Sequence, residues 1–309
     1  MTDILQTAVD VIDGNQLHSL IENFKDTGKR WSVKVGFDPT SPDIHLGHTV
    51  LLNQLKIFQE HGATVDLIIG DFTATIGDPT GKNETRKIIS KEEVIRNSET
   101  YTSQVFKILD PDFTNVHFNS KWLDELGTVG LLQLSSLQSV SRMLERNDFE
   151  NRFKNNQTIS ISEFIYPLLQ GFDSVHLESD VEIGGTDQQF NLLMGRQLQK
   201  SFDKKQQSVI TFPILEGLDG VQKMSKSLNN YIGVNEEPNQ MFAKVMSISD
   251  ELMWKWFQLL SFQDIKTMKS LHPKDAKASL AFEITERFHG TENADNAQHE
   301  FINIFNNHN

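Results

Sequence analysis

Two histidines three residues apart, His45 and His48, stand at the predicted start of a helix. The β-branched run before them ends near Gly36, and Pro39 and Pro42 prevent a strand or a helix from continuing through the turn. A helix that begins after such a turn presents free N–H groups and the positive end of its dipole to an anion. The pattern predicts phosphate binding, although one histidine capping the helix and one in solvent would give the same spacing.

Gly47 lies between the two histidines, and its lack of a Cβ atom allows a flat ring or a backbone to approach closely. A zinc site is not predicted, because the chain has no cysteine. A histidine pair at this spacing also needs further ligands, and no signature for them is near. We therefore expect no metal held by the protein itself.

A second candidate segment, residues 223–227, reads Lys-Met-Ser-Lys-Ser. Lys223 and Lys226 have no apolar surroundings in the sequence that would bury them as structural residues. Their side chains are predicted to supply positive charge to an anionic substrate.

Three polar residues, Tyr166, Gln170 and Asp173, fall at positions i, i+4 and i+7 of a helix predicted over 161–172. They therefore share one face of that helix. A stripe of this kind is often a solvated edge, but the surrounding positions here are apolar. That context favours a stripe that lines a cavity.

Polar residues also follow a predicted strand over 64–70. Asp78 lies in the glycine-rich loop after it, at the carboxyl end of the strand, where open α/β sheets bind ligands. Lys82 and Arg86 come next, in a polar segment that reads either as a solvated loop or as a cationic flap that closes on polyphosphate.

The segment 180–189 repeats the order of strand, glycine pair and helix start. Gly184 and Gly185 allow a flat group to approach closely. Asp187 can accept hydrogen bonds from ribose hydroxyls, or it can act as a plain N-cap.

The elements that must position these residues alternate between strands and helices. Apolar runs before Gly36 and Gly70, with a helix over 46–59 between them, predict a βαβ unit. The whole pattern predicts an α/β fold with a Rossmann-like parallel sheet over 1–220 and a helical insertion at about 120–160. A lysine-serine loop is expected at 221–235, followed by an α-helical domain at 236–309.

The composition is that of an ordinary globular chain of 309 residues, with 38% apolar and 23% charged residues. The net charge of −13 argues against a general nucleic-acid binder, so any RNA contact must be local. The N-terminus has no secretory pattern, and no apolar run reaches the ~20 residues that span a bilayer. We expect a cytoplasmic protein that does not associate with a membrane.

The best local group of basic residues reads either as a contact for RNA or as a solvated charged face. It consists of Arg142, Arg146, Arg152 and Lys154.

The ordered pair of motifs, His-Leu-Gly-His at 45–48 and Lys-Met-Ser-Lys-Ser at 223–227, resembles the HIGH and KMSKS motifs of the class I aminoacyl-tRNA synthetases. Within that class, the stripe at 166–173 followed by Gly-Gly-Thr-Asp-Gln at 184–188 is similar to the bacterial-type tyrosyl-tRNA synthetases. The resemblance covers the chain from about residue 30 to about residue 245. It implies activation of L-tyrosine with ATP, accompanied by Mg²⁺, and transfer of tyrosine to tRNA(Tyr).

The resemblance also implies roles for single residues. Asp78, Tyr166 and Gln170 would hold the substrate ammonium group, Asp173 the phenol, and Gln188 would lie near the carboxylate. The residues implied for ATP binding are Gly36, Asp38, Gly47, Gly184, Gly185, Asp187 and Lys226. The residues implied for catalysis are Thr40, His45, His48, Lys82, Arg86, Lys223 and Lys226.

Two departures from the family pattern stand out. Many tyrosyl enzymes have a tyrosine that bonds the phenol at the position of Lys34. Lys34 could donate to the phenol oxygen, pair with Asp173 or point away along the strand. The family also usually adds a C-terminal RNA-binding domain, whereas this sequence ends at Asn309. We expect normal adenylate formation but weak charging of tRNA from this length of chain.

Related synthetases pair through the helical insertion, which carries more apolar residues than one helix needs, so a homodimer is expected. These residues are Leu131, Leu132, Leu134, Leu137 and Val140. Two rival hypotheses remain: an adenylate-forming enzyme of the same fold that serves another acceptor, and a non-catalytic RNA-binding relative. The second would have lost Lys223, Lys226 or the histidines, and none is lost.

Overall fold

The computed structural model describes residues 4–80 and 89–307. The chain divides into two compact units. The first consists of Met1–Pro42, Leu55–Thr102 and Leu109–Phe212, and the second of Asp43–Gln54, Ser103–Ile108 and Pro213–Asn309. The start of the histidine helix and the lysine-serine loop therefore both belong to the second unit. The domain boundaries at 220 and 235 stay predictions.

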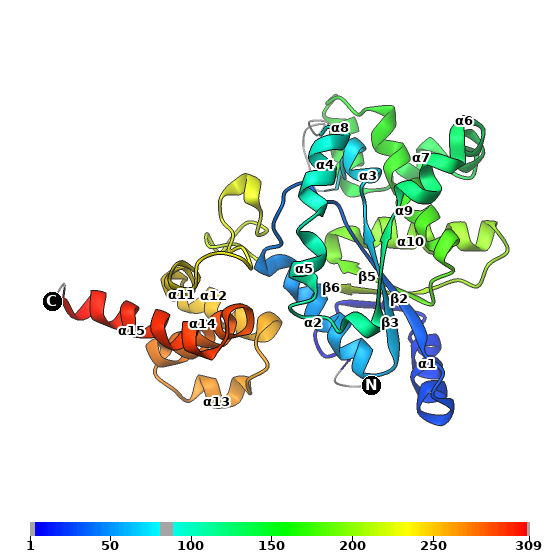
Figure 1. Cartoon of the computed structure of the whole chain (residues 1–309). Coiled ribbons are helices and arrows are strands. Elements are labelled where there is room, and N and C mark those ends of the chain that lie inside the picture. Colours follow the sequence, from blue (N-terminus) through cyan, green and yellow to red (C-terminus); the bar gives the residue numbers. More distant parts are fainter. Residues whose placement is uncertain (1–3, 81–88, 308–309) are drawn as a thin grey trace. The chain divides into compact units, whose positions relative to one another are not determined.

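A six-stranded sheet organises the first unit (Figure 1). The strand order is β1-β6-β5-β2-β3-β4. The strands are β1 (Asp10–Ile12), β2 (Trp31–Phe37), β3 (Ala63–Ile69), β4 (Thr114–Phe118), β5 (Val181–Gly185) and β6 (Ser208–Phe212). β1 pairs antiparallel with β6, and the other neighbours are parallel. The predicted Rossmann-like parallel sheet is confirmed. The short β1 strand, which makes the sheet mixed, was not predicted.

The inner strands are largely buried, as expected where both faces of a sheet are covered. Six of the seven residues of β3 are buried, and every residue of β6 is buried. β2 lies between β3 and β5, so the turn that follows it leaves from the middle of the sheet. This is the position at which ligands bind in open α/β sheets.

The helices up to residue 201 lie between these strands in the sequence. They are α1 (Gly14–Thr27), α2 (Leu46–Glu60), α3 (Thr73–Ile76), α4 (Lys91–Ser98), α5 (Tyr101–Val105), α6 (Ser120–Ser136), α7 (Val140–Met143), α8 (Asn147–Lys154), α9 (Ile161–Leu177) and α10 (Gln189–Ser201). Helices α4 and α5 follow each other closely but are separate. Thr100, between the two helices, donates a hydrogen bond to the Pro42 carbonyl, and Asn97 in α4 donates one to the Pro39 carbonyl.

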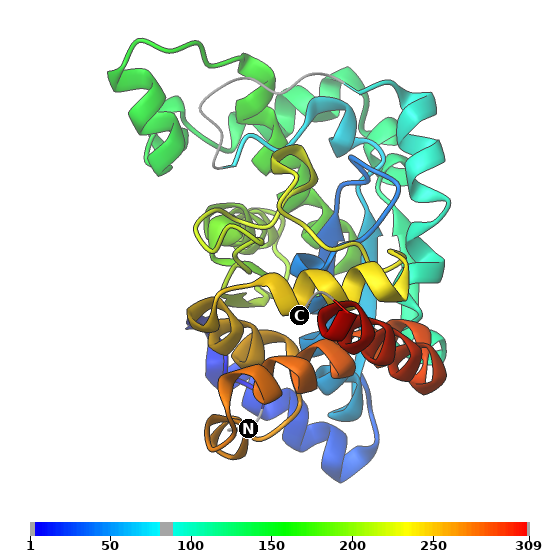
Figure 2. The ribbon, with the colours of Figure 1, turned by 90° about the vertical axis from the view of Figure 1, so that its left-hand side faces the viewer.

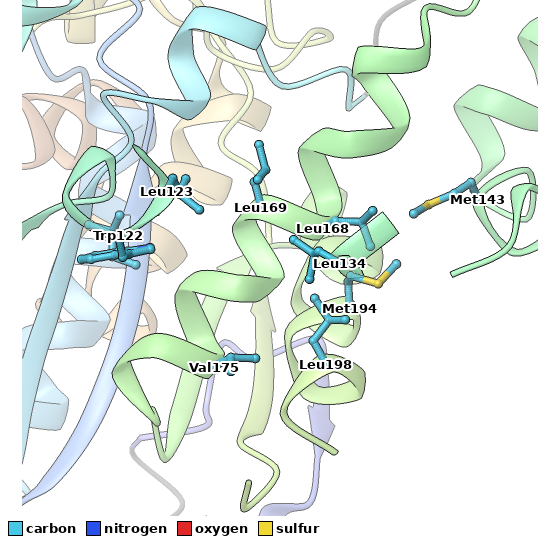
Figure 3. Packing of buried hydrophobic residues seen from close by; sticks show 10 residues of the cluster. Trp122, Leu123, Leu134, Met143, Leu168, Leu169, Val175, Met194 and Leu198 are labelled. Carbon is cyan, nitrogen blue, oxygen red and sulfur yellow. The ribbon is translucent and has the colours of Figure 1, made fainter. Parts of the chain in front are cut away.

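Helices α9 and α10 pack unusually close to each other. A Cβ atom at Gly171 would lie 3.1 Å from the backbone nitrogen of Gly195, so neither helix accommodates a larger residue at this crossing. Leucine and methionine side chains from α6, α7, α9 and α10 form one core around the crossing (Figure 3). The insertion at 120–160 is thereby fixed to the helix that carries Tyr166, Gln170 and Asp173.

The second unit ends in helices, as predicted for its C-terminal part. They are α11 (Pro238–Ser247), α12 (Asp250–Leu260), α13 (Ile265–Lys269), α14 (Pro273–His289) and α15 (Thr291–Asn307). Figure 2 shows α11, α14 and α15 lying against one another. Across the described residues, none of the helices has both the length and the apolarity needed to cross a membrane.

Candidate active site

Asp173 is buried on α9, at 3% exposure. Trp122 Nε1 donates to its Oδ1 atom at 2.8 Å, and Asn119 Nδ2 donates to its Oδ2 atom at 3.4 Å. Burial raises the pKa of Asp173 from 3.8 to about 7, while the charge of Lys34 and the two donors lower it and Glu182 raises it. Asp173 is therefore a carboxyl group poised between its two protonation states near neutral pH.

Sequence reasoning missed Asn119 and Trp122. Asn119 directly follows β4, so it lies at the same carboxyl edge of the sheet as Asp78. The rule that pointed to Asp78 would also have pointed to Asn119. Trp122 carries no comparable signal, because its indole nitrogen meets Asp173 only after α6 and α9 have packed together.

Asp38 and Tyr166 lie together at the end of β2. The Tyr166 hydroxyl donates to Asp38 Oδ2 at 2.9 Å, and Thr73 Oγ1 donates to Asp38 Oδ1 at 2.8 Å. A Cβ atom at Gly70 would lie 2.1 Å from Asp38 Oδ1, so glycine is needed there. The arrangement holds one carboxylate in a fixed orientation beside a tyrosine hydroxyl.

A second carboxylate, that of Asp78, is hydrogen-bonded to the side chain of Gln188. Gln188 Nε2 donates to Asp78 Oδ2 at 2.7 Å, and Asn191 Nδ2 donates to Gln188 Oε1 at 3.0 Å. The backbone N–H of Thr80 donates to Asp78 Oδ1 at 2.9 Å. The structure thus brings together a predicted ammonium-binding residue and a predicted carboxylate-binding residue from separate parts of the chain.

Lys34 is bonded inside the fold, in an arrangement other than the pair with Asp173 considered from the sequence. Its ammonium group forms an ion pair of 2.8 Å with Glu182 and donates to the backbone carbonyl of Gln170 at 3.2 Å. The side chain is 1% exposed. The Glu182 partner was not anticipated.

The backbone around the predicted nucleotide residues differs from place to place. A Cβ atom at Gly36 would meet nothing within 4 Å, whereas one at Gly184 would lie 3.1 Å from Leu192. Gly36 therefore borders open space and Gly184 borders packed side chains. Asp187 lies in a short 3-10 turn, Thr186–Gln188, and the N-cap of α10 is Gln188. The plain N-cap interpretation of Asp187 is therefore wrong.

Gly185 and Thr40 complete the predicted residues of the first unit. Gly185 is the last residue of β5, directly before the turn that holds Asp187. Thr40 is exposed in the turn after β2, where its N–H donates to the Asp38 carbonyl at 2.8 Å. Lys82 and Arg86 lie outside the described residues.

In the second unit, backbone hydrogen bonds tie the start of α2 to the segment that follows the lysine-serine loop. Leu46 N donates to the Ile232 carbonyl and Val234 N donates to the Ile44 carbonyl, both at 2.9 Å. His45 pairs with Gly233 in the same short bridge. The start of the histidine helix is therefore bonded through the backbone to residues 232–234, a few residues after the Lys-Met-Ser-Lys-Ser motif.

The two histidine rings are in contact, with their centroids 3.9 Å apart and their planes tilted by 42°. The N–H of His45 donates to His48 Nδ1 at 3.2 Å, and the N–H of Gly47 donates to His45 Nδ1 at 3.1 Å. Because both Nδ1 atoms accept, each neutral ring carries its proton on Nε2. A Cβ atom at Gly47 would lie 2.9 Å from the His45 ring, so this turn requires glycine.

Burial and neighbouring positive charges keep both rings neutral. Burial, His48, Lys223 and Lys226 lower the pKa of His45 far below its usual range. Burial and the charge of Lys223 lower the pKa of His48 to about 4. At pH 7 the pair can donate hydrogen bonds to phosphate oxygens without carrying charge of its own.

The lysine-serine loop is anchored at its methionine. Met224 is 1% exposed, and its N–H donates to the Leu215 carbonyl at 2.8 Å. Lys226 is 20% exposed and pairs with Asp43 at 3.0 Å, with its ammonium group 5.5 Å from the centre of the Tyr231 ring. Lys223 stands two residues into the same loop, at the bridge with Glu216. The loop thus presents the ammonium groups of Lys223 and Lys226 beside the histidine turn.

The prediction of a basic surface group is wrong for two of its four residues, Arg146 and Arg152, because both are buried. Arg146 is 6% exposed and binds both oxygens of Asp148, and Arg152 is 1% exposed and pairs with Glu163. Their charges are neutralised inside the fold, so they cannot meet RNA phosphates. Arg142 and Lys154 pair with glutamates on the surface.

Within the described ranges, no group of three or more histidine, aspartate or glutamate side chains is placed to hold a metal ion.

Comparison with known proteins places these features in a family. A family model described as tRNA synthetases class I (W and Y) matches residues 25–306. The tyrosine–tRNA ligase of Wolinella succinogenes is 56% identical over 315 residues, which cover 99% of this chain and 78% of that protein. The ligase of Haemophilus influenzae is 58% identical over 294 residues, covering 93% of this chain and 73% of that protein.

Solved structures agree on the fold. A C-terminally truncated mitochondrial tyrosyl-tRNA synthetase of Aspergillus nidulans superposes with a TM-score of 0.80 at 21% identity, covering 98% of this chain and 93% of that one. The tyrosyl-tRNA synthetase of Archaeoglobus fulgidus complexed with L-tyrosine gives a TM-score of 0.76 at 24% identity, covering 96% of this chain and 98% of that one.

Proposed function

We propose that this chain, which belongs to the class I tRNA synthetases of the tryptophan and tyrosine family, activates L-tyrosine with ATP and transfers the tyrosyl group to tRNA(Tyr). The observation that carries the choice of amino acid is Asp173. It is a buried hydrogen-bond acceptor at the end of the polar stripe on α9, whose surrounding positions are apolar, and it suits a phenolic hydroxyl. High identity to tyrosine–tRNA ligases over nearly the whole chain supports the same assignment.

The amino acid would be held by the polar residues of the first unit. Asp78, Tyr166 and Gln170 bind its ammonium group, Gln188 lies near its carboxylate, and Asp173 accepts from its phenol. Hydrogen bonds already hold the side chains of Asp78 and Tyr166 in place. This supports their roles, because a side chain that is fixed in advance loses little conformational freedom when the substrate binds.

In the first step the carboxylate of tyrosine attacks the α-phosphorus of ATP, a bond forms between them, and pyrophosphate leaves. The nucleophile is already ionised, so no general base is required. Catalysis then consists of positioning and of stabilising charge on the five-coordinate phosphorus and on pyrophosphate.

The second unit supplies groups suited to that task. The neutral His45 and His48 donate from Nε2 to phosphate oxygens, and the helix start adds its N–H groups. Lys223 and Lys226 neutralise pyrophosphate, together with Lys82 and Arg86. Thr40 contacts the phosphates from the turn after β2.

The adenosine part of ATP would meet the remaining predicted residues. These are Gly36, Asp38, Gly47, Gly184, Gly185 and Asp187, with Lys226 at the phosphates. The open space beside Gly36 supports the approach of a flat base there. Mg²⁺ would arrive with ATP rather than in a site made by the protein.

The experiment that tests this function is ATP–pyrophosphate exchange with each of the twenty amino acids, followed by charging of tRNA(Tyr). We expect exchange with tyrosine alone and transfer to that tRNA. Exchange with tyrosine but no transfer to any tRNA would favour the alternative, an adenylate-forming enzyme with a different acceptor. No feature of the chain favours that alternative.

We also propose that the enzyme acts as a homodimer in the cytoplasm. Apolar side chains on α6 and α7 are strongly exposed, with Val129 at 70%, Leu132 at 67% and Val140 at 62%. Exposed apolar groups of this kind mark protein contacts. Light scattering should give twice the 35.2 kDa mass of the chain, and a monomer at micromolar concentration would contradict the dimer alone.

A further inference from the structure

The buried ammonium group of Lys34 has three hydrogen-bond partners, one for each of its protons. It bonds Ser174 Oγ at 2.6 Å, Glu182 at 2.8 Å and the Gln170 carbonyl at 3.2 Å. Lys34 and Glu182 are direct neighbours in the register of β2 and β5. With all three donors used, Lys34 has no proton left for a substrate phenol.

Glu182 is fixed as firmly as Lys34. Its second carboxylate oxygen accepts from Ser174 Oγ at 3.0 Å and from the Gln207 side chain. A Cβ atom at Gly195 would lie 2.6 Å from Ser174 Oγ and 3.0 Å from Glu182, so α10 closes directly over these groups. The pair is therefore a rigid, closed network rather than a mobile ion pair.

Two of the Lys34 contacts flank Asp173 on α9. The Gln170 carbonyl lies three residues before Asp173 and Ser174 one residue after it. Lys34 thus joins β2 to the part of α9 that carries the phenol-binding carboxyl group. The charge of Lys34 also acts on Asp173 directly, against that of Glu182.

Building on the proposed function, we propose that Lys34 is a positioning residue for tyrosine selection: anchored by Glu182, its ammonium group fixes Asp173 and favours the ionised form of its carboxyl group, without touching the phenol. A buried ionised carboxylate left without the phenol is costly, whereas a neutral carboxyl group loses much less. Rejection of phenylalanine therefore depends on the charge of Asp173.

This assignment predicts that the preference for tyrosine over phenylalanine rises with pH. The charged groups that act on Asp173 are Lys34 from β2 and Glu182 from β5, and the uncharged side chains of Trp122 and Asn119 donate hydrogen bonds to it. Because burial raises the pKa of Asp173 to about 7, the rise should be centred near neutral pH.

The test measures kcat/KM for tyrosine and for phenylalanine in ATP–pyrophosphate exchange from pH 6 to pH 9. Lys34→Met should move the midpoint of the selectivity curve upward by about one pH unit or more, and lower selectivity at pH 7 about tenfold. Glu182→Gln should move the midpoint downward, because it removes the charge that opposes Lys34. A purely structural role would not produce opposite shifts.

Two further variants control for damage to the fold. Lys34→Met combined with Glu182→Met replaces the ion pair by apolar groups, which often preserves stability, but the double variant should still lack wild-type selectivity. Glu163→Gln neutralises a different buried pair at the start of α9, with Arg152, and should leave the midpoint unchanged.

An unchanged midpoint in folded Lys34→Met would overturn the inference. If that variant does not fold, an unchanged or raised midpoint in Glu182→Gln would overturn it equally. Either result leaves the proposed function intact as long as the wild-type chain shows tyrosine-dependent exchange. Absence of that exchange in wild type would overturn both.

Discussion

The charged residues of the tyrosine site in the first unit are buried, whereas Lys226 in the loop of the second unit is partly exposed. In the first, Lys34, Glu182 and Asp173 are each 3% exposed or less and have partners inside the fold. In the second, Lys226 is 20% exposed and pairs with Asp43, whose side chain is 42% exposed. Selecting a hydroxyl group requires partners that are costly to leave unpaired, whereas stabilising pyrophosphate requires charges that can leave one partner for another.

The comparison predicts opposite pH dependences for the two units, and the larger belongs to Asp173. Its pKa is raised from 3.8 to about 7, so between these values the folded state holds a proton that the unfolded state has lost. Stability should therefore fall as pH rises through this range, by about 4 kcal/mol for this group alone. Chemical denaturation of the Asp173→Asn variant from pH 4 to pH 8 should lack this fall in the free energy of unfolding.

The histidine turn should show the reverse. The pKa of His48 is lowered from 6.5 to about 4, so between these values the unfolded state binds the extra proton. Stability should rise with pH in this range by at most about 3 kcal/mol. His48→Asn, which keeps an acceptor for the His45 N–H, should flatten the rise, and the exposed His299→Asn should not. A rise that persists in His48→Asn would show that other groups cause it.

Removing the single, partly exposed cation of Lys226 should lower activity without lowering stability. Lys226→Ala is expected to slow adenylate formation by ~10²-fold or more, the scale of one preorganised charge contact. Its melting temperature should change little, because the pair with Asp43 is partly exposed. Stopped-flow measurement of adenylate formation decides this, with Lys255→Ala, another paired lysine of the same unit, as the control. Wild-type rates in Lys226→Ala would remove the loop from the mechanism.

The smallest expected effect is on the selectivity for tyrosine over phenylalanine, which depends on the buried Asp173. Asp173→Asn keeps the shape of the side chain but not its charge, so phenylalanine no longer leaves a charged group unpaired. The ratio of kcat/KM for tyrosine to that for phenylalanine should fall at least about tenfold. If the variant rejects phenylalanine as strongly as wild type, the phenol does not bind at Asp173.

The sequence alone was sufficient for the parallel sheet, the histidine turn, the lysine-serine loop and the stripe on α9. These features depend on local rules: apolar runs, proline and glycine positions, and the helical period. The Gly47 turn is an example, because its close contact is with His45, two residues away. The short β1 strand escaped prediction because three residues carry too little pattern.

Only the tertiary structure decided which charges are paired and buried. Lys34 and Glu182 are 148 residues apart in the chain and become neighbours because β2 lies next to β5, an order that no local pattern specifies. In the same way, α9 brings Glu163 to Arg152 and removes that arginine from the surface. Burial and partner choice are properties of the packed elements, so the same lysine or arginine in the sequence can be a ligand, a solvated charge or an internal support.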